Sequence, residues 1–261
     1  MIPTSSTKLM GGLGNYLFQI AAAFAVSLRD NKKLIVDTSD IQVVHDPLEN
    51  YKDNILRRIT FRNGIEGYTP ISQDGFHYTE IPRIPNSTKL FGYFQTEKYF
   101  EDYSDHVRSL YEITPSLKKQ LLEKYGEVLK NETVSLHVRR TNYLKFPNHH
   151  PVQPVEYYKK AVELLGNDKT YLIFSDDMDW CHENFGFINN KIFIGNQTDY
   201  EDLYLMSMCK DNIIANSSFS WWGSWLNKNP DKKVIAPKVW FGNAYSHWNL
   251  NDLYCKKWIK L

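Results

Sequence analysis

The chain of 261 residues has little cysteine and no long hydrophobic run, and each lack excludes a class of protein. Its three cysteines, Cys181, Cys209 and Cys255, are odd in number and far apart, so we expect neither a disulfide framework nor a Cys-x-x-Cys zinc site. No apolar stretch reaches the roughly 18 residues of a membrane-spanning helix. Residues 1–10 are polar and do not resemble a signal peptide, and we therefore expect a cytoplasmic protein.

An excess of charge of either sign is also missing. Lys and Arg number 31 against 30 Asp and Glu, a net charge of +1, so the general basic surface of a nucleic-acid-binding protein is not expected. Aromatic residues, in contrast, make up 15% of the chain, with 17 Tyr and 7 Trp. Many of them must pack in a core, but aromatic rings also line clefts that stack against sugars.

The second half of the chain alternates between strand and helix patterns. Apolar runs predict strands at 133–138, 171–175, 191–194, 212–215 and 233–236. Helical spacing with start and stop signals predicts helices at 154–165, 178–185, 199–209 and 219–226. Repeated strand–helix units of this kind form a parallel sheet covered by helices, so we expect a Rossmann-like domain over residues 131–261.

The first half begins in the same way but becomes irregular. A short strand at 8–10 meets a glycine-rich turn, a helix over 17–28 and a strand at 33–37. Residues 41–88 give no clear pattern, 90–94 resembles a strand, and Thr114-Pro115 opens a polar helix to about residue 130. We therefore expect an α/β protein with a second Rossmann-like domain over residues 1–130. Two such domains facing each other would enclose a cleft.

Two adjacent arginines follow the first strand of the second half. The period of two along this strand places His137 and Arg139 on the same side. A planar guanidinium at the carboxyl end of a parallel strand suits a phosphate ligand, because α/β sheets bind ligands in crevices at those ends. The alternative is a surface Arg139-Arg140 pair that neutralises nearby carboxylates.

The glycine-rich turn at residues 11–15 is a second candidate for anion binding. Gly12 and Gly14 lie between a strand and a helix, where backbone N–H groups can approach an anion at the helix N-terminus. The dinucleotide fingerprint is incomplete, because Leu17 stands where its third glycine would be, and no Gly-Lys-Ser/Thr of a P-loop follows. A tight turn without a ligand explains the glycines equally well.

Two further loops carry polar side chains at the ends of predicted strands. Ser175, Asp176 and Asp177 follow one strand, where a carboxylate could accept hydrogen bonds from a base or ribose, bind a metal together with Asp179, or cap the next helix. Near residue 216, hydroxyls and backbone N–H groups precede a short helix, which is the geometry of an anion site. Its residues are Asn216, Ser217, Ser218 and Phe219, followed by Trp221, Trp222 and Trp225, of which one or two are expected to pack.

Together these segments resemble glycosyltransferase family 11, the α-1,2-fucosyltransferases that use GDP-fucose. The resemblance is carried by Gly-Gly-Leu-Gly-Asn at 11–15, the segment at 90–100, His-Val-Arg-Arg at 137–140 and Ser-Ser-Phe-Ser-Trp-Trp at 217–222. More distantly, the motifs are similar to those of α-1,6- and protein O-fucosyltransferases. The resemblance implies a GT-B-like fold, an acceptor-side first domain, a second domain that binds the GDP-sugar, inversion at the anomeric carbon and no metal.

The resemblance also implies roles for individual residues. Arg139 would bind the β-phosphate of GDP and stabilise the leaving group, Arg140 would hold the loop or a second phosphate oxygen, and Asn15 would reach the phosphate or the sugar. His137 would face the guanine edge, which Asp176 or Asp177 would read. The donor-binding set expected is Gly12, Gly14, His137, Arg140, Asn142, Ser175, Asp176, Asp177, Asn216, Ser217, Ser218 and Phe219.

The sequence departs from the family pattern at two positions. Tyr16 stands where glutamine commonly follows the glycine turn, and Asn142 stands where aspartate commonly follows the arginines. An amide cannot act as a carboxylate base, so Glu97 is a candidate base, with His149 and His150 as weaker ones. Alternatively, the departing GDP phosphate takes the proton. The expected activity is transfer of fucose to galactose O2 on a glycan acceptor; the alternatives are another GDP-sugar or a non-catalytic carbohydrate-binding protein.

Overall fold

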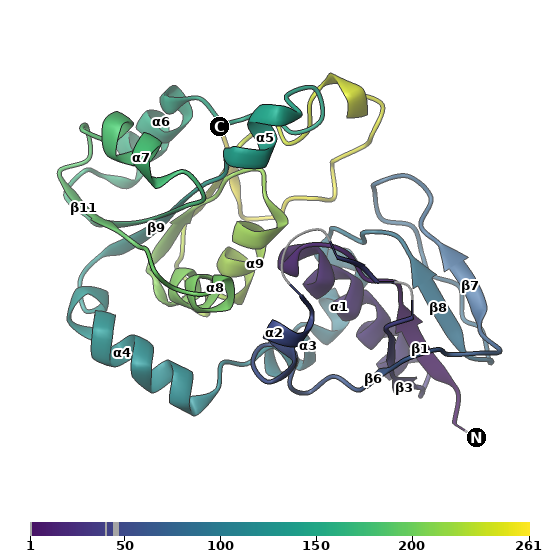
Figure 1. The fold of residues 1–261 in the computed structure, drawn as a ribbon. Coiled ribbons are helices and arrows are strands. Elements are labelled where there is room, and N and C mark those ends of the chain that lie inside the picture. Colours follow the sequence, from purple (N-terminus) through teal and green to yellow (C-terminus); the bar gives the residue numbers. More distant parts are fainter. Residues whose placement is uncertain (1, 40, 44–46) are drawn as a thin grey trace. The chain divides into compact units, whose positions relative to one another are not determined.

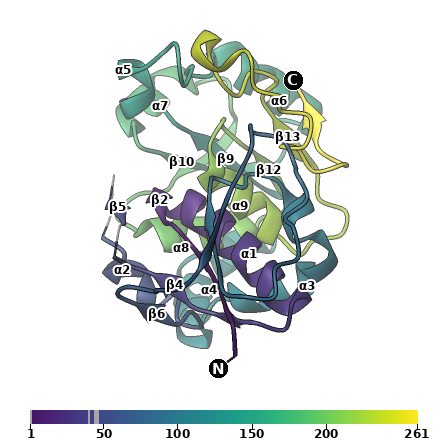
Figure 2. The same cartoon turned by 90° about the vertical axis from the view of Figure 1, so that its right-hand side faces the viewer.

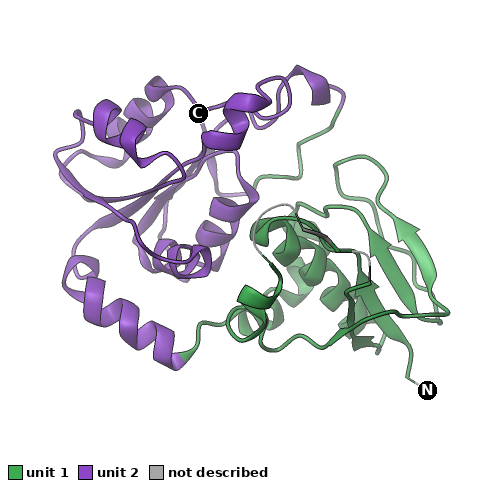
Figure 3. Cartoon of the chain, in the orientation of Figure 1, with its two compact units in different colours: residues 1–114, 248–255 green, residues 115–247, 256–261 purple. Residues whose placement is uncertain are grey.

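The computed structural model describes residues 2–39, 41–43 and 47–261, which form two compact units (Figures 1 and 3). Unit 1 comprises the chain up to Thr114 together with Trp248–Cys255, and unit 2 comprises Pro115–His247 and Lys256–Leu261. The boundary between Thr114 and Pro115 lies one helix earlier than the expected boundary between residues 130 and 131. That helix, α4 (Pro115–Leu129), belongs to unit 2. This helix contacts α8 (Asp199–Met208) of unit 2 and clusters with it.

Unit 2 lies wholly within the described residues and is built on a parallel sheet of six strands. The strand order is β11-β10-β9-β12-β13-β14, and every neighbouring pair is parallel. In the turned view of Figure 2, β10, β9, β12 and β13 follow one another across the sheet. The strands are β9 (Thr133–Val138), β10 (Thr170–Ser175), β11 (Asn190–Phe193), β12 (Asp211–Ile213), β13 (Val234–Ala236) and β14 (Ile259–Lys260).

Helices cover both faces of this sheet, with α6 and α7 on one face and α8 and α9 on the other (Figure 1). Their bounds are α6 (Val155–Leu165), α7 (Met178–Asn184) and α9 (Ser218–Leu226); α5 (Thr141–Lys145) and a 3-10 turn, η3 (Asn243–Tyr245), complete the unit. All six residues of β9 are buried, and its apolar side chains share a core with α6 and α7. The five predicted strands and four predicted helices are confirmed to within two residues at each end.

Among its described residues, unit 1 contains a four-stranded parallel sheet of order β3-β1-β8-β7 and two small parallel pairs, β2-β5 and β4-β6. Helix α1 (Leu13–Arg29) packs on β1, and most of its residues are buried. The strands are β1 (Thr4–Thr7), β2 (Met10–Gly11), β3 (Lys33–Leu34), β4 (Val36–Asp37), β5 (Gln42–Val43), β6 (Phe61–Arg62), β7 (Thr69–Ser72) and β8 (Thr88–Phe91). The other elements are α2 (Glu49–Lys52), η1 (Glu97–Tyr99), η2 (Glu101–Tyr103) and α3 (Ser104–Leu110).

The strand expected at residues 8–10 overlaps the short strand β2 only at Met10, and the first strand of the described chain is the polar segment Thr4–Thr7. Ser5, Ser6 and Thr7 of this strand are buried although they are polar, and the hydroxyls of Ser5 and Ser6 find partners inside the unit. Ser5 Oγ donates to Ala23 O at 2.8 Å, and Ser6 Oγ accepts from Asp37 N at 3.1 Å. A hydrophobicity pattern cannot detect such a strand. The segment 41–88 also contains strands and a helix; residues 44–46 lie outside the described residues.

A buried ion pair joins two strands of unit 1. Lys89 Nζ lies 2.9 Å from Asp37 Oδ2, and both side chains are only 2% exposed. Burial alone would raise the pKa of Asp37, but the hydrogen bond from Lys89 and that from Ser39 lower it to about 2. The other carboxylate oxygen accepts from Ser39 N and Gly64 N at 3.0 Å. The charged carboxylate is therefore fully hydrogen-bonded.

We expect Lys89→Met to lower the free energy of unfolding at pH 7 by about 3–5 kcal/mol, because it leaves the Asp37 carboxylate buried without its cation. Adding Asp37→Asn should restore part of that loss. The depressed pKa of Asp37 means that this carboxylate stabilises the fold fully above its unfolded pKa of about 4 and loses the effect as pH falls through about 2. Urea titrations should therefore show the advantage of wild type over Asp37→Asn shrinking between pH 4 and 2; a constant difference would contradict this account.

Candidate active site

The strand order of unit 2 places two loops on either side of a switch point. Starting from β9, the chain first adds β10 and β11 on one side of the sheet. It then returns to the other side of β9 and adds β12, β13 and β14 there. Ligands of doubly wound sheets bind outside the carboxyl ends of the strands at such a point. Arg139 follows β9 and Asn216 follows β12 closely, so both loops lie at the edge where a ligand is expected.

The carboxylate of Asp176 ties the arginine loop to the end of β10. Its Oδ2 lies 3.0 Å from Arg139 Nη1 and accepts from the hydroxyl of Thr141 at 2.6 Å. Its Oδ1 accepts from the backbone N–H of Arg140 at 2.8 Å. These bonds hold the backbone after β9 in place and orient the Arg139 guanidinium, whose side chain remains 25% exposed.

Arg140 points to a different partner from Arg139. Its Nε lies 2.9 Å from Asp177 Oδ2, and its guanidinium carbon lies 4.1 Å from the centre of the Trp180 ring. Asp177 Oδ1 also caps α7 by accepting from Trp180 N at 3.3 Å, and Ser175 Oγ accepts from Asp177 N at 2.9 Å. The Asp177 carboxylate thus acts as a helix cap and an ion-pair partner, and these contacts join the arginine loop to α7.

The loop after β12 combines a buried amide with the start of α9. Asn216 is 2% exposed, and its Nδ2 donates to Pro151 O and Trp240 O, each at 2.9 Å. Within the described part of the chain, Asn216 Oδ1 is buried without a hydrogen-bond partner. Ser217 is the N-cap residue of α9, and Ser218 and Phe219 form its first turn. A helix N-terminus presents N–H groups that can bind an anion.

The tryptophans of α9 have a packing role. Trp221, Trp222 and Trp225 are at most 3% exposed and lie against one another, with Trp258 against Trp221. Sequence reasoning expected packing for one or two of them, and the structure buries all three. They anchor the helix that begins at Ser218.

His137 is a neutral, buried residue of the central strand. Its ring lies 5.5 Å from that of Phe219. Burial lowers the pKa of His137 to about 3, because the attraction of Asp176 does not offset the desolvation of the charged form. Its Nδ1 has no hydrogen-bond partner among the described residues. His137 therefore carries no charge at neutral pH.

The glycine turn belongs to unit 1. Gly11 has a φ of +84°, and a Cβ there would lie 2.2 Å from Asn15 Nδ2, so this position requires glycine. Asn15 Oδ1 accepts from Gln95 Nε2 at 2.7 Å. Gly12 is the N-cap residue of α1, and Gly14 is buried in its first turn. The structural requirement for glycine is clearest at Gly11, which precedes the two glycines selected from the sequence.

Glu97 lies two residues beyond Gln95, at the start of η1 in unit 1, and is half-buried. A hydrogen bond therefore links the glycine turn to the segment that carries Glu97. Gln95 was not singled out from the sequence, although it lies in the motif at 90–100.

Tyr143, three residues after Arg140, was given no role from the sequence. Its hydroxyl donates to Asn216 O at 2.9 Å, which joins the arginine loop to the loop after β12. Asn142, its neighbour in α5, is half-buried. The signal that could have found Tyr143 is its place in the sequence, because it lies in the short helix α5 that begins directly after the two arginines.

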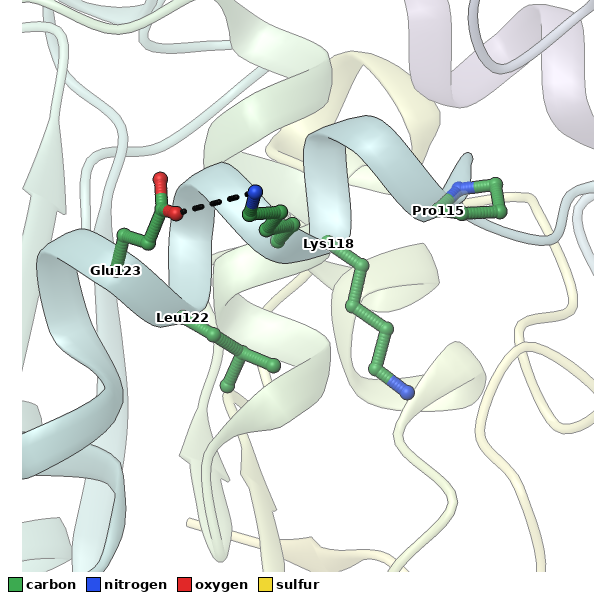
Figure 4. Close-up of a pocket in the computed structure, with 5 residues that line it drawn as sticks. Pro115, Lys118, Leu122 and Glu123 are labelled. Carbon is green, nitrogen blue, oxygen red and sulfur yellow. Dashed lines mark ion pairs between the residues drawn. The ribbon is translucent and has the colours of Figure 1, made fainter.

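We also searched the rest of the described structure for metal sites, membrane-spanning helices and pockets. Among the residues it describes, no group of three or more His, Cys, Asp or Glu is placed to hold a metal ion, and no helix is long and apolar enough to cross a membrane. A hollow along α4 is lined by Pro115, Lys118, Lys119, Leu122 and Glu123 (Figure 4). None of the expected site residues lines it.

Comparisons with known proteins agree with the fold and with the motifs. The fucosyltransferase NodZ from Bradyrhizobium, in a crystal structure soaked with GDP-fucose, superposes with a TM-score of 0.53 over 86% of this chain and 93% of its own, at 13% identity. This likeness shows the fold alone and confirms the predicted α/β class and GT-B-like type.

Two proteins of Escherichia coli are similar over nearly the whole chain. The O-antigen biosynthesis glycosyltransferase WbnK is 31% identical, covering 97% of this chain and 99% of its own. An α-1,2-colitosyltransferase is 30% identical, covering 97% of both chains. The model of the family described as glycosyl transferase family 11 matches residues 2–261. The chain is therefore a glycosyltransferase and belongs to glycosyltransferase family 11.

Proposed function

We propose that this glycosyltransferase moves fucose from GDP-fucose to the 2-hydroxyl of a galactose unit, with inversion at the anomeric carbon and without a metal. The observation that carries the proposal is Arg139, a partly exposed guanidinium held by Asp176 at the switch point of the unit 2 sheet. Membership of family 11 and the GDP-fucose soaked into the NodZ crystal support the choice of donor.

The geometry suits a single displacement. The bond between the sugar C1 and a β-phosphate oxygen breaks, the acceptor oxygen bonds to C1, and GDP departs with both electrons of the broken bond. Negative charge then develops on the β-phosphate, where the guanidinium of Arg139 and the N-terminus of α9 stabilise it. Because the electrostatic groups are already held by Asp176 and the α9 core, little reorganisation is needed at the transition state.

In this proposal unit 2 binds the donor and unit 1 contributes the acceptor side, including Asn15. The carboxylates of Asp176 and Asp177 already accept several hydrogen bonds each, which makes them poor candidates for a base. A guanine edge would have to share Asp176 or Asp177 with the arginine loop. Glu97 is then the preferred base, and the departing GDP phosphate is the alternative.

A second candidate function is transfer of colitose, a deoxygenated relative of fucose. The observation that favours it is the α-1,2-colitosyltransferase that is 30% identical over 97% of this chain. The phosphate-binding groups would be the same for both donors, so the two functions differ only in the contacts to the sugar.

We expect Arg139→Ala to lower kcat/KM for GDP-fucose by at least about 100-fold, because it removes a charge-stabilising donor at the leaving group. Arg139→Lys should retain part of the activity, since it keeps the charge but loses the planar fork. Steady-state kinetics on both variants measure the effect. Arg83→Ala, which removes a guanidinium that is 72% exposed in unit 1, is the matched control. Full activity in Arg139→Ala would rule out the proposed role.

We expect GDP to raise the melting temperature more than UDP or ADP does, in buffer containing excess EDTA, because binding to the native state stabilises it. A donor screen in the same buffer, with lactose as acceptor and NMR of the product, compares GDP-fucose with GDP-colitose and reports the linkage. Equal shifts for the three nucleotides would remove the guanine assignment. Activity lost in EDTA and restored by Mn²⁺ would instead favour a metal at Asp177 and Asp179.

We expect Glu97→Gln to lower kcat by at least about 100-fold while leaving GDP affinity unchanged, because general bases contribute on this scale to the chemical step. Calorimetric titration with GDP separates binding from catalysis. Glu101→Gln, in the next 3-10 turn, is the control for a lost surface charge. Retained activity in Glu97→Gln would favour the departing phosphate as the proton acceptor.

A further inference from the structure

Tyr143 lies between the two loops that flank the switch point of unit 2. The guanidinium carbon of Arg139 is 5.7 Å from the centre of its ring, within the range of a cation–π contact. Its hydroxyl donates to Asn216 O at 2.9 Å. A single side chain therefore contacts both the arginine that follows β9 and the backbone that precedes α9.

The hydroxyl of Tyr143 is a permanent donor. Burial raises the pKa of Tyr143 to about 12, because desolvation of the phenolate outweighs the opposing charge of Arg139. The hydroxyl therefore keeps its proton, and with it the hydrogen bond to Asn216 O, at neutral pH. It fixes the backbone at the residue before the N-cap of α9.

The ring of Tyr143 also packs against a group of other rings. His150 stacks on it with ring centres 4.9 Å apart and an interplanar angle of 22°, and His150 in turn contacts Phe241 and Tyr245. The loops that carry these rings are joined by Gly242 N donating to His149 O at 3.0 Å. A Cβ on Gly242 would lie 2.4 Å from Asn148 O, so the two loops pack at van der Waals contact. The ring of Tyr143 is thus held by its contact with His150.

We propose that Tyr143 is a positioning residue that holds the Arg139 guanidinium and the N-terminus of α9 at a fixed separation matched to the terminal phosphate of the nucleotide. This inference rests on the proposed function, because it assigns the β-phosphate to Arg139. Its consequence is selective: Tyr143 should matter for ligands that carry a β-phosphate and not for those that lack one.

The test is a comparison of GDP and GMP binding by isothermal titration calorimetry. In Tyr143→Phe the ring stays and the hydroxyl is lost, so we expect GDP affinity to fall about tenfold, the size of one hydrogen bond. GMP affinity should change by less than about twofold. In an Arg139→Lys background, the same substitution should weaken GDP binding by less than about threefold, because the two side chains act on one phosphate.

A matched control separates positioning from folding. Tyr171→Phe removes a hydroxyl that donates to Gly166 O at 2.8 Å near the opposite end of β10, so it should lower the melting temperature about as much as Tyr143→Phe without changing the GDP-to-GMP affinity ratio. Tyr143→Leu, which also removes the ring, should reduce that ratio further.

The outcomes distinguish the two hypotheses. If wild type binds GDP no better than UDP or ADP, the proposed function fails. If wild type prefers GDP but Tyr143→Phe keeps the wild-type GDP-to-GMP ratio, or weakens both ligands equally, only the positioning role of Tyr143 is overturned.

Discussion

The parallel pairing of β9 between β10 and β12 is the constraint on which the rest of the candidate site depends. In a parallel sheet all strands end at the same edge, so three loops far apart in sequence arrive together at the carboxyl ends of these strands. The strand order reverses between β9 and β12, which separates the helices that follow them and leaves room for a ligand. Every contact described around Arg139 is a consequence of this arrangement.

Two side chains brace this edge, where the phosphate is proposed to bind. Asp176 binds the backbone and side chains of the β9 loop, and Tyr143 joins that loop to the start of α9. The first contact gives the Arg139 guanidinium a fixed counter-ion, Asp176. A bound phosphate would have to compete with Asp176 for Arg139 or share it. In the proposal, the second contact sets the spacing between the Arg139 guanidinium and the N-terminus of α9. Preorganisation of this kind is what an enzyme needs when charge develops on a leaving group.

Most of unit 2 could be read from the sequence, because buried parallel strands are short apolar runs and their helices carry clear caps. Thr198 and Glu201 form the capping box that begins α8, as their spacing predicts. Unit 1 could be predicted less well, since β1 is a polar strand in which the hydroxyls of Ser5 and Ser6 are hydrogen-bonded to residues distant in sequence. The buried pair of Asp37 and Lys89 is similarly invisible, because 52 positions separate its members.

The sequence by itself determined most elements of unit 2, the candidate residues of its loops and, through its motifs, the family. Those are local properties: period, caps and short motifs need only neighbouring residues. The tertiary structure alone decided the partner of each charged group. Arg139 and Arg140 are adjacent in the chain yet pair with different carboxylates, and Asp177 serves α7 as well as Arg140. Such assignments depend on which loops the sheet brings together, and long-range register is not encoded in any single segment.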